Sequence, residues 1–153
     1  MKQFFGLFVL GLFVVSAIGC GGGNPYGTAQ ISGKVTYEDG TPFSWANEAE
    51  QKAVTLYFYP QADPKDPKTY PRYGSTQLAP DGTFANATTY EYADGVIRGK
   101  CKVVVKPTKS GQDVPEKEIK KLKLIDLSFT NADKTPLEFE ITPNAVLDIK
   151  VKK

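Results

Sequence analysis

Short stretches in which apolar and polar residues alternate constrain this chain more than any other feature of its sequence. The clearest stretch is residues 99–106, where Cys101, Val103 and Val105 alternate with lysines and Val104 is the single exception. Alternation with a period of two is typical of a β-strand that buries one face. Because Gly, Pro and Asp separate these stretches, the pattern predicts an all-β domain.

Seven strands are expected from this pattern. They cover residues 30–37, 53–59, 75–79, 83–86, 99–106, 137–141 and 145–151. Pro80, Asp81 and Gly82 stand in turn order and predict a hairpin between the third and fourth strands. We expect Pro107 to end the fifth strand, because proline lacks the N–H that a sheet ladder needs. Residues 88–92 are expected to extend an edge, and residues 142–144 form the last turn.

Strands with one apolar face bury that face best when two sheets pack together. The prediction is therefore an antiparallel β-sandwich of about seven strands over residues 30–153. About 134 residues remain if residues 1–19 are removed, which is enough for one domain with a core.

Three segments do not follow the strand pattern. Residues 43–52 hold the only tryptophan, Trp45, and a polar run that predicts one or two helical turns. Residues 60–73 contain four prolines and predict an extended loop without ladder bonds, either functional or disordered. Residues 109–124 predict a short helix that begins at Pro115. The lysines of that helix either contact anionic lipid headgroups or are simply solvated.

The first 23 residues have the layout of a secretory signal. Lys2 supplies a positive start, residues 4–18 are apolar apart from Gly and Ser, and small residues precede Cys20. Fifteen residues in a helix reach only about 22 Å, less than the roughly 30 Å of a bilayer core. A cleaved signal peptide over residues 1–19 is therefore the better prediction than a membrane-spanning helix.

The small residues before Cys20 resemble the lipobox of bacterial lipoproteins. The resemblance implies that Cys20 carries a diacylglycerol, usually with a further acyl chain such as palmitate on its new amino terminus, and stable anchoring needs two such chains. Residues 20–29 then form a lipidated cysteine and a flexible tether. Gly21 is not the Asp that retains many such lipoproteins in the inner membrane, so an outer-membrane or surface location is implied. The alternative is an ordinary cleaved signal with Cys20 as a free thiol.

Charge and cysteine content exclude some classes of protein. Lys2 is the only charged residue among the first 19, so the remaining chain has 18 basic and 17 acidic residues and a net charge of +1. This balance gives no electrostatic basis for nucleic-acid binding. If the sulfur of Cys20 carries lipid, Cys101 is the only thiol left and no internal disulfide forms. Cys101 lies in a strand pattern, where a buried cysteine behaves as a small hydrophobic residue.

The residues required for common catalytic sites are missing from the sequence. The chain has no histidine, so it holds no Ser-His-Asp triad, no Cys-His pair and no imidazole zinc ligand. Asp63 and Asp66 lack the density of a calcium loop, and a lysine lies between them. We therefore expect neither an enzyme nor a metal or cofactor site.

The order of the strand and turn motifs resembles a known family of domains. The matching positions are residues 31–37 with Asp39, Gly40 and Pro42, then Val54, Phe58 and Pro60, then Thr76 and residues 81–84, residues 99–105 and 114–117, and finally Thr135, Pro136, Leu137, Ile141 and Asn144. This series is similar to planctomycete-type lipoproteins with a carboxypeptidase regulatory-like, or transthyretin-like, β-sandwich. The resemblance implies the fold and the anchor but no catalytic activity. Cys101 departs from the family pattern, which usually has Tyr there.

Tyrosines are the candidate binding residues. Tyr57 and Tyr59 alternate with Leu56 and Phe58 and should point away from the core, while Tyr70 and Tyr73 lie in the following loop. Such rings either stack on sugars and anchor partner proteins, or merely cover a sheet face and pin the loop. The sequence thus favours a lipid-anchored cell-envelope module that is non-catalytic and binds a protein partner or has a structural role. The alternative is a carbohydrate-binding module that uses the exposed tyrosines on a cell-wall glycan.

Overall fold

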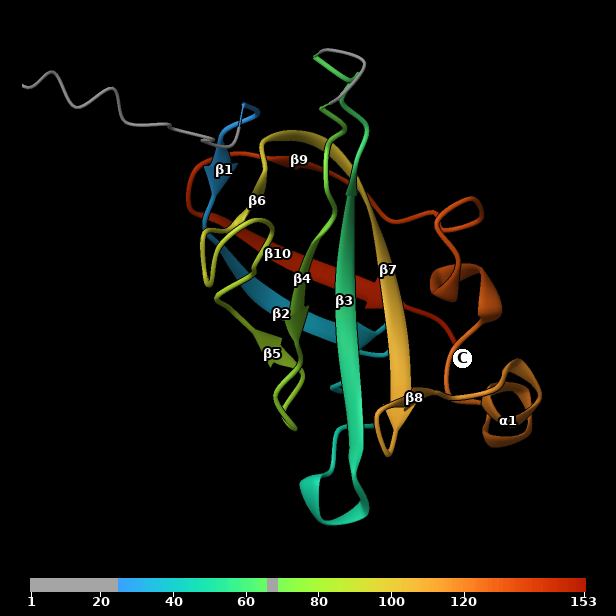
Figure 1. Ribbon diagram of the computed structural model, residues 1–153. Helices are drawn as coiled ribbons and strands as arrows, with labels where there is room; N and C mark the ends of the chain where they lie inside the picture. Colours follow the sequence, from blue (N-terminus) through green and yellow to red (C-terminus); the bar gives the residue numbers. More distant parts are fainter. Residues whose placement is uncertain (1–24, 66–68) are drawn as a thin grey trace, which may run out of the picture.

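The computed structural model describes residues 25–65 and 69–153, and in this part of the chain two main β-sheets pack face to face (Figure 1). The larger sheet contains β3 (Lys52–Pro60), β4 (Gly74–Gln77), β7 (Gly99–Lys109), β8 (Gln112–Asp113) and β9 (Glu138–Ile141). The smaller sheet contains β2 (Ile31–Tyr37), β5 (Thr83–Phe84) and β10 (Ala145–Val151). The predicted all-β sandwich is confirmed. The signal peptide and Cys20 lie outside the described residues.

The centre of the larger sheet is the antiparallel pair of β3 and β7. Its register runs from Lys52 opposite Lys109 to Pro60 opposite Cys101. Along β3, Val54, Leu56 and Phe58 are buried while the residues between them are partly exposed, as the period-two pattern predicts. These side chains meet those of β2 and β10 between the two sheets, where the core lies.

One strand pair departs from the antiparallel prediction. β10 pairs with β2 in parallel, from Ala145 beside Ile31 to Val151 beside Tyr37. Residues 142–144 turn the chain as expected, but they carry it from β9 in the larger sheet to β10 in the smaller one. Alternation determines which face a strand buries and does not distinguish a parallel neighbour from an antiparallel one, so the sequence pattern could not reveal this pairing.

The predicted hairpin at residues 80–82 is a corner between the two sheets. The turn itself is present, closed by the Ala79 N–H, which donates to the Thr83 carbonyl over 2.8 Å. Its two arms separate, however, because β4 pairs with β3 and β5 pairs with β2. Residues 88–92 form no strand; Thr88 makes a single bridge to Ser75.

The expectation that Pro107 ends its strand was wrong. β7 continues to Lys109, and Pro107 lies buried opposite Val54. The Pro107 carbonyl accepts a hydrogen bond from Val114 N–H, on the side away from β3. Since the N–H and C=O of one residue in an antiparallel strand point to the same side, the missing N–H removes no bond between β3 and β7.

The described end of the predicted tether belongs to the domain. Thr28 and Ala29 form β1 (Thr28–Ala29), which pairs with β6 (Val96–Ile97), and Ala29 is buried. The backbone comes very close to Gly95, where a Cβ would lie 2.2 Å from the Ala29 carbonyl oxygen. Only a glycine allows this contact, so the ordered domain begins before Gln30.

The helical segments are short and lie at the edges of the sandwich. The 3₁₀ helix η1 (Glu48–Glu50) lies within the predicted residues 43–52. Helix α1 (Glu116–Leu122) starts after Pro115, as predicted, and buries only Ile119. A second 3₁₀ helix, η2 (Leu127–Thr130), buries Phe129 and Thr130 beside β7. No helix in the described residues has the length and apolar character needed to cross a bilayer.

Candidate functional site

Three of the four candidate tyrosines come together on the outer face of the larger sheet. Tyr57 and Tyr59 are two residues apart on β3, and Tyr73 directly precedes β4, which pairs with β3. The Tyr73 ring centroid lies 5.4 Å from that of Tyr57 and 5.5 Å from that of Tyr59. We call Tyr57, Tyr59 and Tyr73 the tyrosine cluster.

The rings of the tyrosine cluster do not form a flat surface. Tyr57 and Tyr73 meet edge to face at 73°, and Tyr59 is tilted by 36° from Tyr57 and by 43° from Tyr73. Tyr73 is 51% exposed, whereas the other two are partly buried. Burial raises the pKa of Tyr57 and of Tyr59, with smaller contributions from Asp113 and Tyr73. Both hydroxyls therefore stay protonated at neutral pH and can donate hydrogen bonds.

Charged side chains surround the tyrosine cluster. Lys102 lies opposite Tyr59 on β7 and pairs with Glu138, with a distance of 3.9 Å between nitrogen and oxygen. Lys106 pairs with Asp113 at 3.5 Å. These pairs are partly to largely exposed and add little stability. An aromatic centre with a charged rim is, however, the usual pattern of a protein-binding surface.

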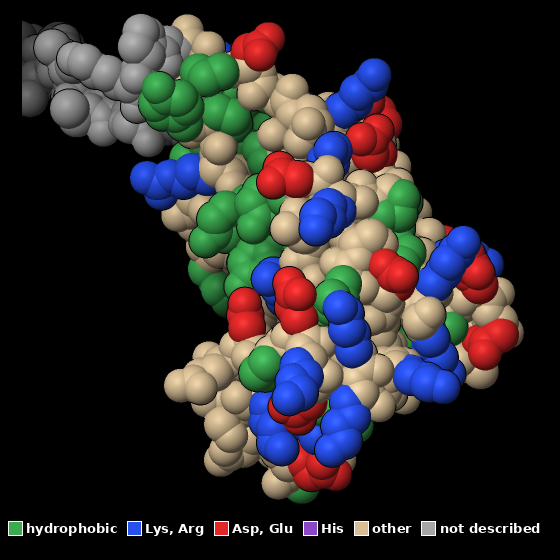
Figure 2. Space-filling view, turned by 90° about the vertical axis from the view of Figure 1, so that its right-hand side faces the viewer, with side chains coloured by type: hydrophobic (Ala, Val, Ile, Leu, Met, Phe, Trp, Pro, Cys, Tyr) green, Lys and Arg blue, Asp and Glu red, His purple; other side chains and the backbone are tan. Residues whose placement is uncertain are grey.

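Val104 is a buried apolar residue on the outer face of β7, between two lysines. It lies opposite Tyr57 and is only 1% exposed, although its side chain is on the face away from the main core. The break in alternation at Val104 was the sequence signal for this second apolar contact, since a valine at a solvent position suggests that a neighbour covers it. Hydrophobic and tyrosine side chains accordingly gather along the left-hand side of Figure 2, which is the side of the larger sheet.

Tyr70 does not join the tyrosine cluster. It makes no ring contact with the other three in the described part of the chain and is 65% exposed. Its neighbour Thr69 accepts a hydrogen bond from the Tyr26 hydroxyl through its carbonyl oxygen, so this loop packs against the segment before β1. The four sequence candidates therefore belong to two different surfaces.

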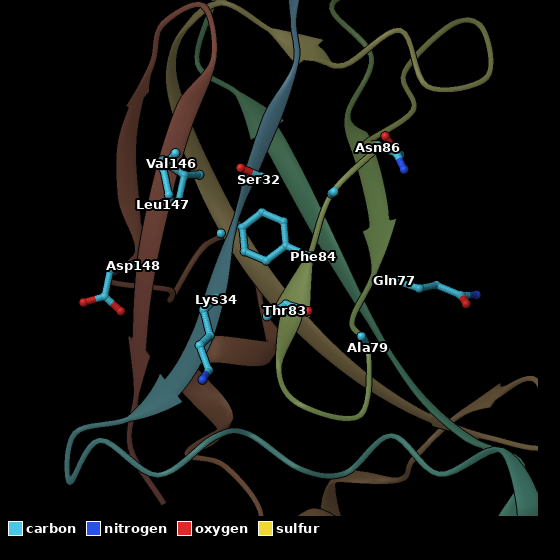
Figure 3. A pocket seen from close by; sticks show the side chains of 12 residues that line it. Ser32, Lys34, Gln77, Ala79, Thr83, Phe84, Asn86, Val146, Leu147 and Asp148 are labelled. Atoms are coloured by element: carbon cyan, nitrogen blue, oxygen red, sulfur yellow. The ribbon is translucent and has the colours of Figure 1, made fainter.

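A groove on the smaller sheet was not expected from the sequence. It has a volume of about 730 Å³ and lies over β10, β2 and β5 (Figure 3). Ser32, Lys34, Val146 and Asp148 line it, and Val146 is 79% exposed. The sequence pattern gave no sign of this groove, because it does not show that β2 and β10 are parallel neighbours.

The lysines of the third irregular segment gather around α1. Lys120 and Lys121 lie in its last turn and Lys117 in its first half, and Figure 2 shows a basic cluster on the lower part of the molecule. Glu116 and Glu118 are interspersed among them. This mixture is typical of a solvated helix surface.

The described residues bring together no group of three or more Asp, Glu, His or Cys that could hold a metal ion. Cys101 is buried, and burial raises the pKa of its thiol to about 12. A thiol with such a pKa is protonated and not nucleophilic at neutral pH. Cys101 therefore has the packing role that its strand pattern indicates.

Comparisons with known proteins do not assign the chain to a family. No family model matches it, and no curated protein matches it. Among solved structures, the chain is similar to a DUF3823 family protein from Parabacteroides merdae, with a TM-score of 0.41 and 14% identity. That similarity covers 82% of this chain and 46% of the other protein, so this chain spans less than half of its length.

Proposed function

We propose that this protein is a lipid-anchored, non-catalytic binding module of the bacterial cell envelope that recognises a partner protein through the tyrosine cluster. The observation that carries the proposal is the meeting of Tyr57, Tyr59 and Tyr73 on one outer sheet face. Tyrosine is enriched at interfaces because it offers a large apolar area with a hydroxyl handle.

The anchor rests on the sequence layout around Cys20. A positive start, an apolar stretch and small residues precede the cysteine, as in the lipobox of bacterial lipoproteins. The motif order and the β-sandwich fit a transthyretin-like domain of the planctomycete lipoprotein type. Gly21 favours the outer membrane or the cell surface by the sorting rule of such lipoproteins.

Ring geometry favours a protein partner over a glycan. Sugars stack best on a ring that lies flat and open, whereas Tyr57 and Tyr73 meet at 73° and two of the three rings are partly buried. The charged rim of Lys102, Glu138, Lys106 and Asp113 offers hydrogen bonds and ion pairs to a protein surface. A carbohydrate-binding role is the second candidate, because Tyr73 presents half of its surface to solvent.

Mass spectrometry of the N-terminal peptide tests the anchor. We expect an acylated peptide that begins at Cys20, together with extraction of the protein only by detergent. Cys20→Ser should release the protein from the membrane fraction or leave it unprocessed. An unmodified peptide from the wild-type protein would refute lipid anchoring.

Cross-linking in the native envelope tests the partner. We expect one stoichiometric protein partner, whose yield falls at least tenfold in Tyr73→Ala, the change on the exposed ring that should disturb folding least. Val146→Ser, on the other sheet, is the matched control and should retain the partner. If no protein is captured but cell-wall polysaccharide binds saturably and the binding is lost in Tyr73→Ala, the glycan role replaces the protein role.

A further inference from the structure

Two loops that carry exposed tyrosines are tied directly to the segment next to the proposed anchor. Of the five large hydrophobic side chains that are exposed among the described residues, two are Tyr70 and Tyr92, at 65% and 91%. Neither belongs to the tyrosine cluster, and neither is needed for the core. Their position in the fold therefore needs a separate explanation.

The loop that carries Tyr70 is held against Pro25 and Tyr26. The Lys65 N–H donates to the Tyr26 hydroxyl over 3.0 Å, and the Tyr26 hydroxyl donates to the Thr69 carbonyl. The Lys65 ammonium donates to the Pro25 carbonyl and lies 5.2 Å from the centre of the Tyr26 ring. The two sides of this loop therefore pack on the first described residues of the chain.

The loop that carries Tyr92 is held against the next residues of the chain, Thr28 to Gln30. The Gln30 amide donates to the Ala93 carbonyl, and Gly95 packs against Ala29. Arg98 follows β6 and is exposed; its Nε donates to the Thr28 carbonyl over 2.9 Å. Both exposed tyrosines thus lie on loops that contact residues 25–30, with a cationic side chain beside each attachment point.

The length of chain before this segment limits its distance from the bilayer. Only four residues lie between Cys20 and Pro25, so the five Cα–Cα steps that join them span at most about 18 Å even when fully extended. If Cys20 is acylated, the end of the sandwich that carries β1 and the flanking parts of the proline-rich loop, residues 60–65 and 69–73, must lie beside the membrane. These segments lie in the upper part of Figure 1, whereas α1 lies in the lower part.

We propose that Tyr70 and Tyr92, with Lys65 and Arg98, form a surface that rests on the headgroup region of the bilayer. Tyrosine is enriched at membrane interfaces, where its apolar ring and its hydroxyl both find suitable surroundings, and lysine and arginine near the bilayer attract anionic headgroups. Asp63 and Glu91 on the same loops limit this attraction, so the tyrosines and the anchor supply most of the contact.

This surface rests on the proposed lipid anchor and sets the orientation of the domain. β3 runs from its start beside η1 to Pro60 at the proposed membrane end. The tyrosine cluster therefore lies on a side face of the sandwich. There it is open to a partner protein that is anchored in the same membrane leaflet. α1, which carries the lysines, lies at the end of the sandwich away from the bilayer. The α1 contact with lipid that the sequence left open is therefore disfavoured.

Tryptophan fluorescence on vesicles tests the orientation with an internal reference. Trp45 is the only native tryptophan and lies at the far end, where its Nε1 donates to the Thr108 carbonyl over 3.1 Å. The strand between these ends, from Ala53 to Pro60, is roughly 24 Å long. The mature, acylated protein is reconstituted on phosphatidylcholine vesicles whose acyl chains are brominated near the headgroup, and on unbrominated vesicles.

In this experiment Tyr70→Trp and Tyr92→Trp should each lose emission on brominated vesicles, while native Trp45 keeps its emission. Leu122→Trp, on the exposed side of α1, is the matched control for an exposed tryptophan at the far end and should also keep its emission. Circular dichroism and thermal melting confirm that each variant is folded. Tyr70→Trp and Tyr92→Trp are separate proteins. If one of them misfolds, the quenching of the other still tests the proposal.

Other outcomes overturn the proposal in distinguishable ways. Proteins that float with vesicles but show no quenching at position 70 or 92 would reject the membrane surface while leaving the anchor intact. Quenching of the Leu122→Trp protein alone would mean that α1 faces the bilayer. Failure of the wild-type protein to float would reject the anchor and, with it, this surface. Iodide in solution quenches exposed tryptophans. If the tryptophan of the Tyr70→Trp protein is protected from iodide quenching in the native envelope but not on vesicles, a protein and not lipid covers position 70.

Discussion

Gly33 and Phe84 lie opposite each other where β2 pairs with β5, and the Phe84 ring occupies the space that a side chain at position 33 would fill. A Cβ on Gly33 would lie 2.8 Å from Phe84 Cζ and 2.1 Å from the carbonyl oxygen of Leu147 on β10. The Phe84 ring is in turn 6.1 Å from Phe58 in the core. Glycine at position 33 therefore allows the three strands of the smaller sheet to close over the core.

Gly33→Ala should destabilise the fold by about 1–3 kcal/mol, the range for overpacking in a tight core, because the Leu147 backbone cannot move away as a flexible side chain would. Urea denaturation measures the change in the free energy of unfolding. Ser32→Ala, whose side chain is on the opposite face, should stay within about 0.5 kcal/mol of wild type. A stable Gly33→Ala protein would show that the smaller sheet does not close as described.

Thr135 joins the chain before β9 to β7 through its side chain. Its hydroxyl donates to the Val103 carbonyl over 2.7 Å and accepts from Leu137 N–H over 3.2 Å, and the residue is 5% exposed. Thr135→Val should cost about 1–3 kcal/mol, because the buried polar partners lose their bonds while the side-chain volume is nearly kept. Thr135→Ser retains the hydroxyl and should recover most of this loss in the same denaturation experiment.

Cys101 should be unreactive in the folded protein. Burial raises its pKa to about 12, so almost no thiolate is present at pH 8. An aromatic disulfide reagent should react slowly under native conditions and rapidly in guanidinium. The denatured, mature protein should release one equivalent of chromophore if the Cys20 sulfur carries lipid, and two if it is free. Rapid native labelling that disappears in Cys101→Ser would contradict the buried position.

Acid should weaken the turns that contain Asp39, Asp81 and Asp126. Each carboxylate accepts hydrogen bonds from the hydroxyl and backbone N–H of a Thr or Ser two residues later, which lowers its pKa below the ordinary 3.8. A lowered folded-state pKa gives a contribution that is present above the unfolded pKa and is lost as the pH falls through the folded pKa.

The midpoint of thermal unfolding should therefore fall as the pH drops from about 4 toward 2, over and above the general effect of acid on other carboxylates. The triple variant Asp39→Asn, Asp81→Asn and Asp126→Asn should show a smaller fall over the same range. Equal slopes for the variant and the wild-type protein would mean that these turns do not contribute to the acid sensitivity.

Local patterns predicted much of what was found. The alternation along β3 and β10 correctly indicated which side chains are buried, because a strand places successive side chains on opposite faces. It also held along β2 and β7 apart from Thr36 and Val104, which are buried although they lie on the outer faces. Pro115 correctly indicated the start of α1. The sequence also suggested that Tyr57 and Tyr59 point outward, which is where they lie.

Pairing between distant segments was the part that these patterns could not predict. Pro107 is tolerated within β7 because its nitrogen faces away from β3, so no hydrogen bond between the two strands is lost. Which way this nitrogen faces depends on the register that places Pro107 opposite Val54. β1 has only two residues, too few to show any period, and is recognisable only beside β6. The separation of Tyr70 from the tyrosine cluster likewise depends on its loop packing against Tyr26.

The sequence by itself determined the longer strands, most of their buried side chains, most of the turns and the absence of histidine chemistry, because these depend on side-chain type and spacing along the chain. Only the tertiary structure decided which strands are neighbours and that β10 lies parallel to β2. It also decided that Tyr73 meets Tyr57 and Tyr59, while the loop that carries Tyr70 packs against Tyr26. The physical reason is that period-two alternation is the same for every possible neighbour. The choice among neighbours is made by packing across the whole core and by close backbone contacts such as the one at Gly33.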